Sequence, residues 1–423
     1  MSKHQDSLPG PDDITRVTIP NGITILARAN FSSPSVVIGG HLACGSLFDT
    51  DEKSGLADFT SLSLMRGTET RDFQQIFDAL ESAGAALSVG AGAHNTGFSG
   101  RSLSEDLPLL LGLLADVLRH PTFPAEQIER LRAQFLSSLA QRAQDTAEVA
   151  SITFDQIVFK GHPYSRPEDG WPETIRAIQR DDLAAFHRQY YGARGMVIAV
   201  VGAIEPKTAV EQVVEILGDW SNAEQVELPD LPPLRPLKKV VTRKVKIQGK
   251  SQSDLIVGAA GPHRKDPDYI ADTLGNSALG QFGLGGRIGN VVREKSGLAY
   301  YASSTLNAGI GPGSWAVSAG VNPANVQKAQ KLIIDEIERF VEDGVTSEEL
   351  EDSQSNFIGR MPLSLESNSG VANALLNIER YDLGLDYFRR YPEMVRAVTP
   401  EQVLAAARKY LDPQRLAIAI AGP

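Results

Sequence analysis

Residues 182–202 read Asp-Leu-Ala-Ala-Phe-His-Arg-Gln-Tyr-Tyr-Gly-Ala-Arg-Gly-Met-Val-Ile-Ala-Val-Val-Gly. Residues 402–422 repeat this pattern without a gap, as Gln-Val-Leu-Ala-Ala-Ala-Arg-Lys-Tyr-Leu-Asp-Pro-Gln-Arg-Leu-Ala-Ile-Ala-Ile-Ala-Gly. In both stretches a helical segment leads through a turn to an apolar strand that ends in Gly. Arg188 matches Arg408 across the two stretches. The chain therefore contains one structural unit twice.

The rest of the chain fits a duplication. Residues 124–135 resemble residues 346–357 at nearly the same offset. A repeat this long indicates duplicated domains, because the periods of solenoid proteins are far shorter. Between the copies lies a Pro-rich stretch that neither a helix nor a central strand tolerates. The sequence predicts four parts: a flexible leader at 1–13, an N-terminal domain at 14–221, a linker at 222–238 and a C-terminal domain at 239–423.

Each half mixes strands and helices without strict alternation. Residues 15–19 and 20–28 form a predicted hairpin, with Asn21-Gly22 as a two-residue turn. Apolar spacing predicts helices at 107–118 and 124–142. This order indicates an α+β fold of two homologous domains, each a mainly antiparallel sheet with helices packed on one face.

The composition is typical of a water-soluble globular protein. Of the 423 residues, 42% are hydrophobic and 22% are charged. The net charge of -11 argues against a nucleic-acid partner, because neutralising phosphates needs a basic surface. No apolar run of about 18 residues predicts a membrane span. The N-terminus lacks the apolar core of a signal peptide, but a removed signal would leave the same appearance, so the compartment stays open between cytoplasm and periplasm.

Residues 54–62 read Ser-Gly-Leu-Ala-Asp-Phe-Thr-Ser-Leu, and Arg66-Gly67-Thr68 follows soon after. This stretch resembles the inverted zinc-binding helix of pitrilysin-like and insulinase-like zinc peptidases, in particular the mitochondrial-processing-peptidase-like branch. In that family Gly-Leu-Ala leads into His-x-x-Glu-His, whose two His bind zinc while the Glu is the general base. Here these three positions hold Asp58, Ser61 and Leu62.

The family takes its third zinc ligand, a Glu, from a later helix. Residues 129–139 resemble that helix, and the resemblance places the ligand position at Ser138 and a supporting acidic position at Leu131. Asp58 is then the one carboxylate that remains where three ligands and a base are needed. This pattern resembles the family's non-catalytic subunit, which implies no cofactor in this chain and a zinc ion in a partner.

The histidine spacing, considered without the resemblance, also argues against a metal site. No two histidines lie within a few residues of each other, so His-x-His and His-x-x-x-His pairs are absent. The only cysteine, Cys44, cannot form a cysteine cluster. We interpret all seven histidines as structural or solvent-exposed. They are His4, His41, His94, His120, His162, His187 and His263.

Residues 292–300 read Val-Arg-Glu-Lys-Ser-Gly-Leu-Ala-Tyr. The resemblance implies that Arg293 and Tyr300 correspond to the family's paired Arg and Tyr, which lie against substrate near the zinc site of a facing half or subunit. A helix that ends at Gly297 would place Arg293 in its last turn and Tyr300 on the next strand, where both can donate to a peptide carbonyl. The structural alternative is a dipole-favoured Arg and a half-buried packing Tyr.

These observations predict a non-catalytic, substrate-binding subunit of a heterodimeric zinc metallopeptidase, which is not an enzyme on its own. Its partners would be a homologous chain that carries the zinc and a peptide on an edge strand of that chain. Two alternatives stay open. One is a structural or peptide-binding protein, such as a core-protein-like scaffold or an inactive homodimer, and the other is an enzyme with an unrecognised metal-independent site.

Overall fold

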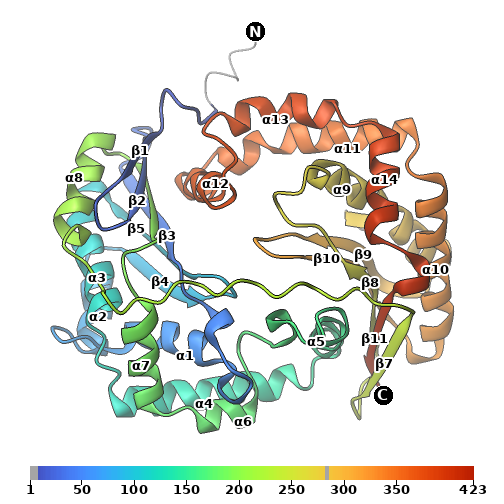
Figure 1. The fold of residues 1–423 in the computed structure, drawn as a ribbon, viewed down its shortest axis with the longest axis horizontal. Helices are drawn as coiled ribbons and strands as arrows, with labels where there is room; N and C mark the ends of the chain where they lie inside the picture. The colour runs from blue at the N-terminus through green and yellow to red at the C-terminus, as the bar shows by residue number, and fades with distance from the viewer. Residues whose placement is uncertain (1–7, 282–284) are drawn as a thin grey trace. The chain divides into compact units, whose positions relative to one another are not determined.

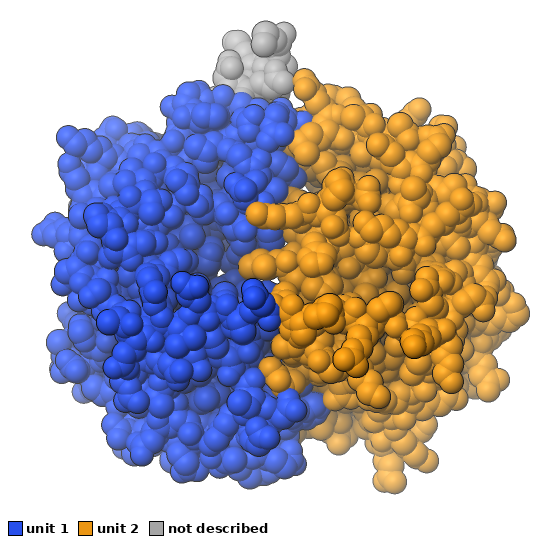
Figure 2. Space-filling model, in the orientation of Figure 1, with its two compact units in different colours: residues 1–138, 167–230, 361–390 blue, residues 139–166, 231–360, 391–423 orange. Residues whose placement is uncertain are grey.

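The computed structural model describes residues 8–281 and 285–423, which form two compact units (Figures 1 and 2). Unit 1 comprises the described residues up to 138, together with 167–230 and 361–390, and unit 2 comprises 139–166, 231–360 and 391–423. These units are not the contiguous ranges 14–221 and 239–423 expected from the sequence. Each unit instead includes one segment from the other half of the chain.

Unit 1 is built on a six-stranded sheet with the order β1-β2-β6-β3-β5-β4. The strands are β1 (Thr15–Thr18), β2 (Thr24–Ala29), β3 (Ser35–Leu42), β4 (Ala86–Ala91), β5 (Thr96–Leu103) and β6 (Val197–Gly202). Only β2 and β6 run parallel, and the other neighbours are antiparallel. The predicted first hairpin is present, but its turn has three residues rather than two. Ile19 N–H bonds to Ile23 O, and Gly22 has a φ of 95°.

Unit 2 is built on a five-stranded sheet with the order β7-β11-β8-β10-β9. The strands are β7 (Val241–Lys246), β8 (Ser253–Ala260), β9 (Ala299–Asn307), β10 (Ser314–Val321) and β11 (Ala417–Gly422). Again one pair, β7 with β11, is parallel and the other pairs are antiparallel. This is the order β2-β6-β3-β5-β4 of unit 1 with the same strand directions. The strands of the sequence repeat, β6 and β11, hold equivalent places, so the duplication is confirmed.

Helices cover both faces of the unit 1 sheet. The face of the sheet that carries Ile38 and Gly100 packs against α3 (Leu107–Arg119). A Cβ built at Gly100 would lie 3.0 Å from Leu110 of this helix and 3.2 Å from Ile38. On the opposite face a Cβ at Gly39 would lie 3.3 Å from Leu376 of α12. The helices of this unit are α1 (Leu56–Ser63), α2 (Phe73–Ser82), α3 (Leu107–Arg119), most of α4 (Ala125–Arg142), α6 (Pro172–Ala177), α7 (Arg180–Tyr190), α8 (Pro206–Leu217) and α12 (Asn368–Tyr381).

Unit 2 has the same arrangement with the halves of the chain exchanged. On one face of its sheet, Phe154 and Val158 of α5 pack against Ala417 and Ala419 of β11. On the other face Ile418 packs in a core with the helices of the second half. The helices are α5 (Thr146–Val158), α9 (Tyr269–Asn276), α10 (Val326–Asp343), α11 (Ser347–Arg360), most of α13 (Tyr387–Arg396) and α14 (Pro400–Tyr410).

The α+β class and the two homologous domains are confirmed. Helices were expected on one face of each sheet, whereas the structure has helices on both faces. One helix from the other half of the chain covers the second face, α12 on β3 and β6 and α5 on β8 and β11 (Figure 1). The reason is visible in β6 and β11, in which every residue is buried. A strand that is apolar at successive positions must be covered on both sides.

The ends of the predicted parts differ in detail from expectation. Within the predicted leader 1–13, residues 1–7 lie outside the described residues, while Leu8 is only 7% exposed and Asp12 forms an ion pair with Arg389. An apolar side chain and a charge thus hold 8–13 on unit 1. The predicted linker 222–238 contains no helix or strand. None of the described helices combines the length and apolar character that a membrane crossing requires.

Candidate functional site

Helix α1, the predicted relic of a zinc-binding helix, begins on a rigid corner. Gly55 precedes it with a φ of 93°. The Asp49 carboxylate accepts hydrogen bonds from the N–H groups of Gly55 at 2.8 Å and Ala57 at 3.0 Å. An acceptor of negative charge at a helix N-terminus satisfies otherwise unpaired N–H groups and is favoured by the helix dipole. The backbone of the relic site is therefore well determined by local contacts.

Asp58 on α1 lies within a group of three carboxylates. Burial and the nearby charges of Asp169 and Glu168 raise the pKa of Asp58 to about 7, although hydrogen bonds from Ala91 and Ser61 oppose this rise. Burial likewise raises the pKa of Glu168. Glu168 and Asp169 could not be predicted from the sequence, because they are far from α1 along the chain and only their acidic character marks them. Burial and the two neighbouring negative charges together favour the protonated form of Asp58 near neutral pH.

Ser61, which the resemblance places at the general-base position, is part of the packed interior. It is fully buried. Its hydroxyl donates to the Asp58 carbonyl oxygen at 2.8 Å and accepts a hydrogen bond from the N–H of Ala91 on β4 at 3.0 Å. Leu62, at the position predicted for the second histidine, is 36% exposed, and its hydrocarbon side chain has no atom that can coordinate a metal. The hydroxyl is thus engaged in linking α1 to the edge of the sheet.

Ser138 lies on α4, the helix that was predicted to carry the third ligand. Its side chain is exposed, whereas Leu131 one heptad earlier is 4% exposed. Helices α1 and α4 pack against each other through Phe59 and Phe135, whose ring centroids are 5.1 Å apart. The structure therefore keeps the two helices of the predicted site adjacent, with side chains that pack rather than coordinate.

The residues at these four positions do not fit a zinc ion. Zinc in proteins takes thiolate, imidazole or carboxylate ligands. Leu62 offers none, Ser138 offers a neutral hydroxyl, and the hydroxyl of Ser61 already has two partners. Across residues 8–281 and 285–423, no group of three or more His, Cys, Asp or Glu side chains is arranged to hold a metal ion. We accordingly assign no catalytic step to a metal held by this chain.

Two histidines, His187 and His41, make structural contacts. His187 Nε2 lies 2.9 Å from Leu118 O, and burial lowers the pKa of His187 to about 4. His41 Nδ1 lies 3.3 Å from the guanidinium of Arg380, and burial together with that cation lowers the pKa of His41 to about 4. Both imidazoles are therefore neutral at pH 7, and each is engaged at one ring nitrogen.

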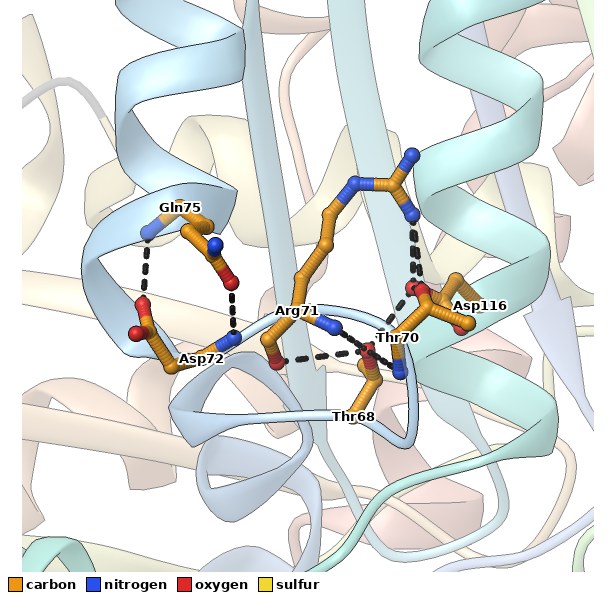
Figure 3. A network of polar contacts seen from close by, with 6 residues as sticks. All are labelled: Thr68, Thr70, Arg71, Asp72, Gln75 and Asp116. Carbon is orange, nitrogen blue, oxygen red and sulfur yellow. Dashed lines mark hydrogen bonds and ion pairs between the residues drawn. The ribbon is translucent and has the colours of Figure 1, made fainter.

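The loop after α1, which carries the Arg66-Gly67-Thr68 sequence, is anchored by Asp116 of α3 (Figure 3). The Asp116 carboxylate, 8% exposed, accepts hydrogen bonds from the hydroxyls of Thr68 at 2.8 Å and Thr70 at 2.6 Å and from the Arg71 guanidinium at 2.9 Å. A capping box then starts α2. Figure 3 shows these contacts converging on one carboxylate, so this loop contributes shape to the relic site rather than chemistry.

Arg293 and Tyr300 lie in unit 2, on either side of a tight turn. Arg293 belongs to the helical segment Gly289–Glu294, and its carbonyl accepts the N–H of Gly297 at 2.8 Å. Gly297 has a φ of 60°, which confirms the predicted left-handed residue at the end of this helix. Tyr300 follows on β9, an edge strand of the sheet.

The exposure of this pair separates the two interpretations given to it. Tyr300 is 81% exposed and therefore does not have the half-buried packing role of the structural alternative. The Arg293 side chain is 43% exposed, and its Nε lies 3.9 Å from a carboxylate oxygen of Glu294. Two hydrogen-bond donors thus stand at the surface of unit 2, where a molecule in solution can reach them.

Comparison with known proteins places both halves of the chain in one peptidase family. Residues 24–167 match the family model described as insulinase (peptidase family M16), and residues 177–357 match the model described as the peptidase M16 inactive domain. An uncharacterized zinc protease of Streptomyces coelicolor is 26% identical over 425 residues, which cover 98% of this chain and 90% of the relative. The probable mitochondrial-processing peptidase subunit beta of Arabidopsis thaliana is 24% identical over 448 residues, which cover 100% of this chain and 81% of the relative.

Solved structures share the same fold. The crystal structure of a peptidase M16 inactive domain from Pseudomonas fluorescens superimposes with a TM-score of 0.90 at 27% identity, covering 97% of this chain and 98% of the other. A protease from Helicobacter pylori superimposes with a TM-score of 0.90 at 18% identity, over 98% of this chain and 100% of the other. The resemblance first noted in the degenerate helix is confirmed, and the chain belongs to the peptidase M16 family.

Proposed function

We propose that this chain is the non-catalytic, substrate-binding subunit of a two-chain zinc metallopeptidase whose homologous partner carries the zinc. One contrast carries the proposal. The positions that the resemblance assigns to the three zinc ligands hold Asp58, Leu62 and Ser138, and the general-base position holds Ser61. Arg293 and Tyr300 are intact and exposed. Relatives named as zinc proteases and as a processing-peptidase subunit support the class of reaction.

In the assembled pair, Arg293 and Tyr300 act on the substrate. The guanidinium and the phenol hydroxyl donate hydrogen bonds to the carbonyl oxygen of the peptide bond that is cleaved. Donors held at that point stabilise the negative charge that develops on the oxygen during water attack. A planar guanidinium is well suited to this, because it stays charged at any physiological pH. The peptide itself lies along an edge strand of the partner, so this chain positions and polarises it.

The test is to co-express this chain with a homologue that carries His-x-x-Glu-His, and to purify each chain alone and the pair. Zinc is measured by mass spectrometry and activity with a fluorogenic peptide. We expect zinc in the partner and in the pair, and cleavage by the pair alone. Stoichiometric zinc together with cleavage in the isolated chain would contradict the proposal.

The alternative, a structural or peptide-binding protein without a catalytic role, is separated by variants of the same pair. Arg293→Ala and Tyr300→Phe remove one donor each, while Lys295→Ala removes an exposed cation from the same turn as a control. A loss of kcat in the first two variants, with the control unchanged, supports a catalytic contribution. Equal activity in all three would make the chain a scaffold.

A further inference from the structure

The two sheets differ at one edge. In unit 1, β1 pairs antiparallel with β2, so that β2 lies inside the sheet. Strand β7 holds the place of β2 in unit 2 and pairs with β11 on one side. Within the part of the chain that the structure describes, no strand pairs with its other side. The sheet of unit 2 is therefore open where the sheet of unit 1 is closed.

The open edge of β7 presents unused backbone groups. The N–H groups of Val241 and Ile247 donate to the carbonyls of Leu416 at 2.9 Å and Gly422 at 2.7 Å. In a parallel pair, alternate residues bond to the same neighbour, so the odd-numbered residues of β7 bond toward β11. The even-numbered residues direct their N–H and C=O groups away from the sheet. These residues are Thr242, Lys244 and Lys246.

In unit 1 the corresponding edge, on β2, is paired with an additional strand, β1. The N–H groups of Thr24 and Asn30 bond toward β6, so the odd-numbered residues of β2 point outward. They pair with β1: Ile25 lies opposite Val17 and Ala27 lies opposite Thr15. The backbone geometry of the duplicated unit is thus suited to an added antiparallel strand at this position.

The sequence around β7 is strongly basic. Five cations lie within residues 238–246, a stretch that contains no Asp or Glu, in a chain whose net charge is -11. All five are exposed, and they are Lys238, Lys239, Arg243, Lys244 and Lys246. Because side chains alternate along a strand, Thr242, Lys244 and Lys246 share one face. Val241 and Val245 share the other face with residues of α5.

A hollow of about 560 Å³ lies beside the lysine face of β7. Lys244 and Lys246 line it together with apolar groups of Pro323, Val326 and Ile420. It is large enough for the side chains on one face of an added strand, and its walls combine positive charge with apolar surface.

We propose that the open edge of β7 is a docking site for an extended acidic segment of a partner protein. The segment adds to the sheet antiparallel to β7, in the place that β1 occupies in unit 1. Its carboxylates alternate with apolar residues, so that the acids lie opposite Lys244 and Lys246 and the apolar residues lie on the face of Val241 and Val245. Main-chain hydrogen bonds supply affinity, and the alternating side chains supply selectivity.

A second copy of this chain does not fit the same edge. Pairing two β7 strands would bring Lys244 and Lys246 against the same cations of the other copy, and like charges on opposed strands are destabilising. Lysines on a sheet edge are also a known protection against self-association. If the lysines only prevent self-association, β7 should have no affinity for an acidic strand. Binding of an acidic peptide therefore distinguishes a docking site from simple protection of the edge.

The binding test uses the full chain and a labelled peptide of three Glu-Val repeats, with fluorescence anisotropy as the readout. A peptide of three Lys-Val repeats is the control for charge. Two further versions carry N-methyl groups on the Glu residues or on the Val residues. In the proposed register the Glu residues bond to β7, so methylation of Glu abolishes binding while methylation of Val leaves it intact.

Variants of the chain test the same edge from the other side. The double variant Lys244→Glu, Lys246→Glu is expected to bind the Glu-Val peptide at least tenfold more weakly than the unaltered chain. It is also expected to bind the Lys-Val peptide, which the unaltered chain does not. Thr242→Pro keeps every charge but removes an outward N–H, and it is expected to weaken binding as well. Arg101→Glu with Lys207→Glu, two exposed cations of unit 1, makes the same change in net charge and should have no effect.

Three results would overturn the proposal: no binding of the Glu-Val peptide to the unaltered chain, equal binding of both N-methylated peptides, or a dimer through β7 detected by sedimentation and disrupted by Thr242→Pro. Circular dichroism of each variant checks that the fold is retained. None of these outcomes depends on peptidase activity, so the docking site and the proposed function stand or fall separately.

Discussion

The corner at α1 in unit 1 and the turn at Gly297 in unit 2 are the two parts of this molecule that resemble peptidase machinery, and they differ in burial. At α1, Ser61 is fully buried and Asp58 sits among other carboxylates. Beyond Gly297, Tyr300 is 81% exposed. Residues at the first corner are explained by packing and hydrogen bonds. Those at the second are not, because an exposed phenol contributes little to the stability of the fold.

In unit 1, residues at the positions predicted for a zinc site or close to them have structural roles instead. Ser61 bridges α1 and β4, and the loop after α1 is tied to Asp116. A site that now stabilises its own unit is not expected to regain zinc by one substitution. In unit 2, by contrast, the side chains of Arg293 and Tyr300 are exposed and can contact another molecule.

The largest expected effect comes from separating the two halves of the chain at the linker. Residues 1–230 lack α12, which leaves a face of β3 and β6 uncovered, and residues 231–423 lack α5, which leaves the Ala417 and Ala419 side of β11 uncovered. We expect neither half to fold alone and both to form a native complex when refolded together. Near-ultraviolet circular dichroism and gel filtration provide the measurement. Cooperative unfolding of either half alone would contradict the exchange of helices.

Next in size is the effect of Arg293→Ala on the assembled pair. Loss of one donor to a developing oxyanion typically lowers kcat about 100-fold. The thermal midpoint of the isolated chain should change little, because the side chain is 43% exposed and its nearest carboxylate oxygen, on Glu294, is 3.9 Å away. Steady-state kinetics and calorimetry measure the two quantities. A fall in stability comparable with the fall in activity would show that Arg293 supports the fold instead.

Asp116→Ala should have the opposite signature. The carboxylate accepts three hydrogen bonds from the loop after α1, and its removal leaves those donors unpaired. We expect a loss of about 2–3 kcal/mol in the free energy of unfolding. Urea denaturation measures it. Glu126→Ala, at an exposed surface pair with Arg130, is the control and should leave stability nearly unchanged.

The smallest effect concerns the pH dependence contributed by Asp58. Its ordinary pKa of 3.8 is raised to about 7 by burial and by Asp169 and Glu168. A carboxyl whose pKa is raised on folding stabilises the native state fully below about pH 4, and that contribution is lost as the pH rises toward 7. Asp58→Asn should therefore be more stable than the unaltered chain by about 1–2 kcal/mol at pH 8, and this difference should shrink as the pH falls from 7 to about 4.

Urea titrations of Asp58→Asn across this pH range provide the measurement. Asp78→Asn, the same substitution at an exposed position of α2, serves as the control. A variant of Asp58 whose stability relative to the unaltered chain is the same at pH 4 and pH 8 would contradict the raised pKa.

Much of the fold could be predicted from local patterns. The repeated helix and strand of residues 182–202 and 402–422 do hold equivalent places in two sheets, and Gly297 does end its helix. The exchange of α5 and α12 could not be predicted, because an apolar helix face shows that the helix is covered without showing which sheet covers it. The same limit hid Glu168, since its proximity to Asp58 depends on how distant loops meet.

The sequence by itself determined the duplication, the α+β class and the residue types Asp58, Ser61, Leu62 and Ser138 at the positions where the resemblance predicts a zinc site. These depend on residue type and on spacing along the chain, which the sequence contains directly. The tertiary structure alone decided that α5 and α12 are exchanged and that Ser61 is buried while Tyr300 is exposed. It also decided that, among the residues described, no strand pairs with the outer edge of β7. Each of these depends on which distant segment becomes a neighbour, and that is settled by the packing of whole faces rather than by any local pattern.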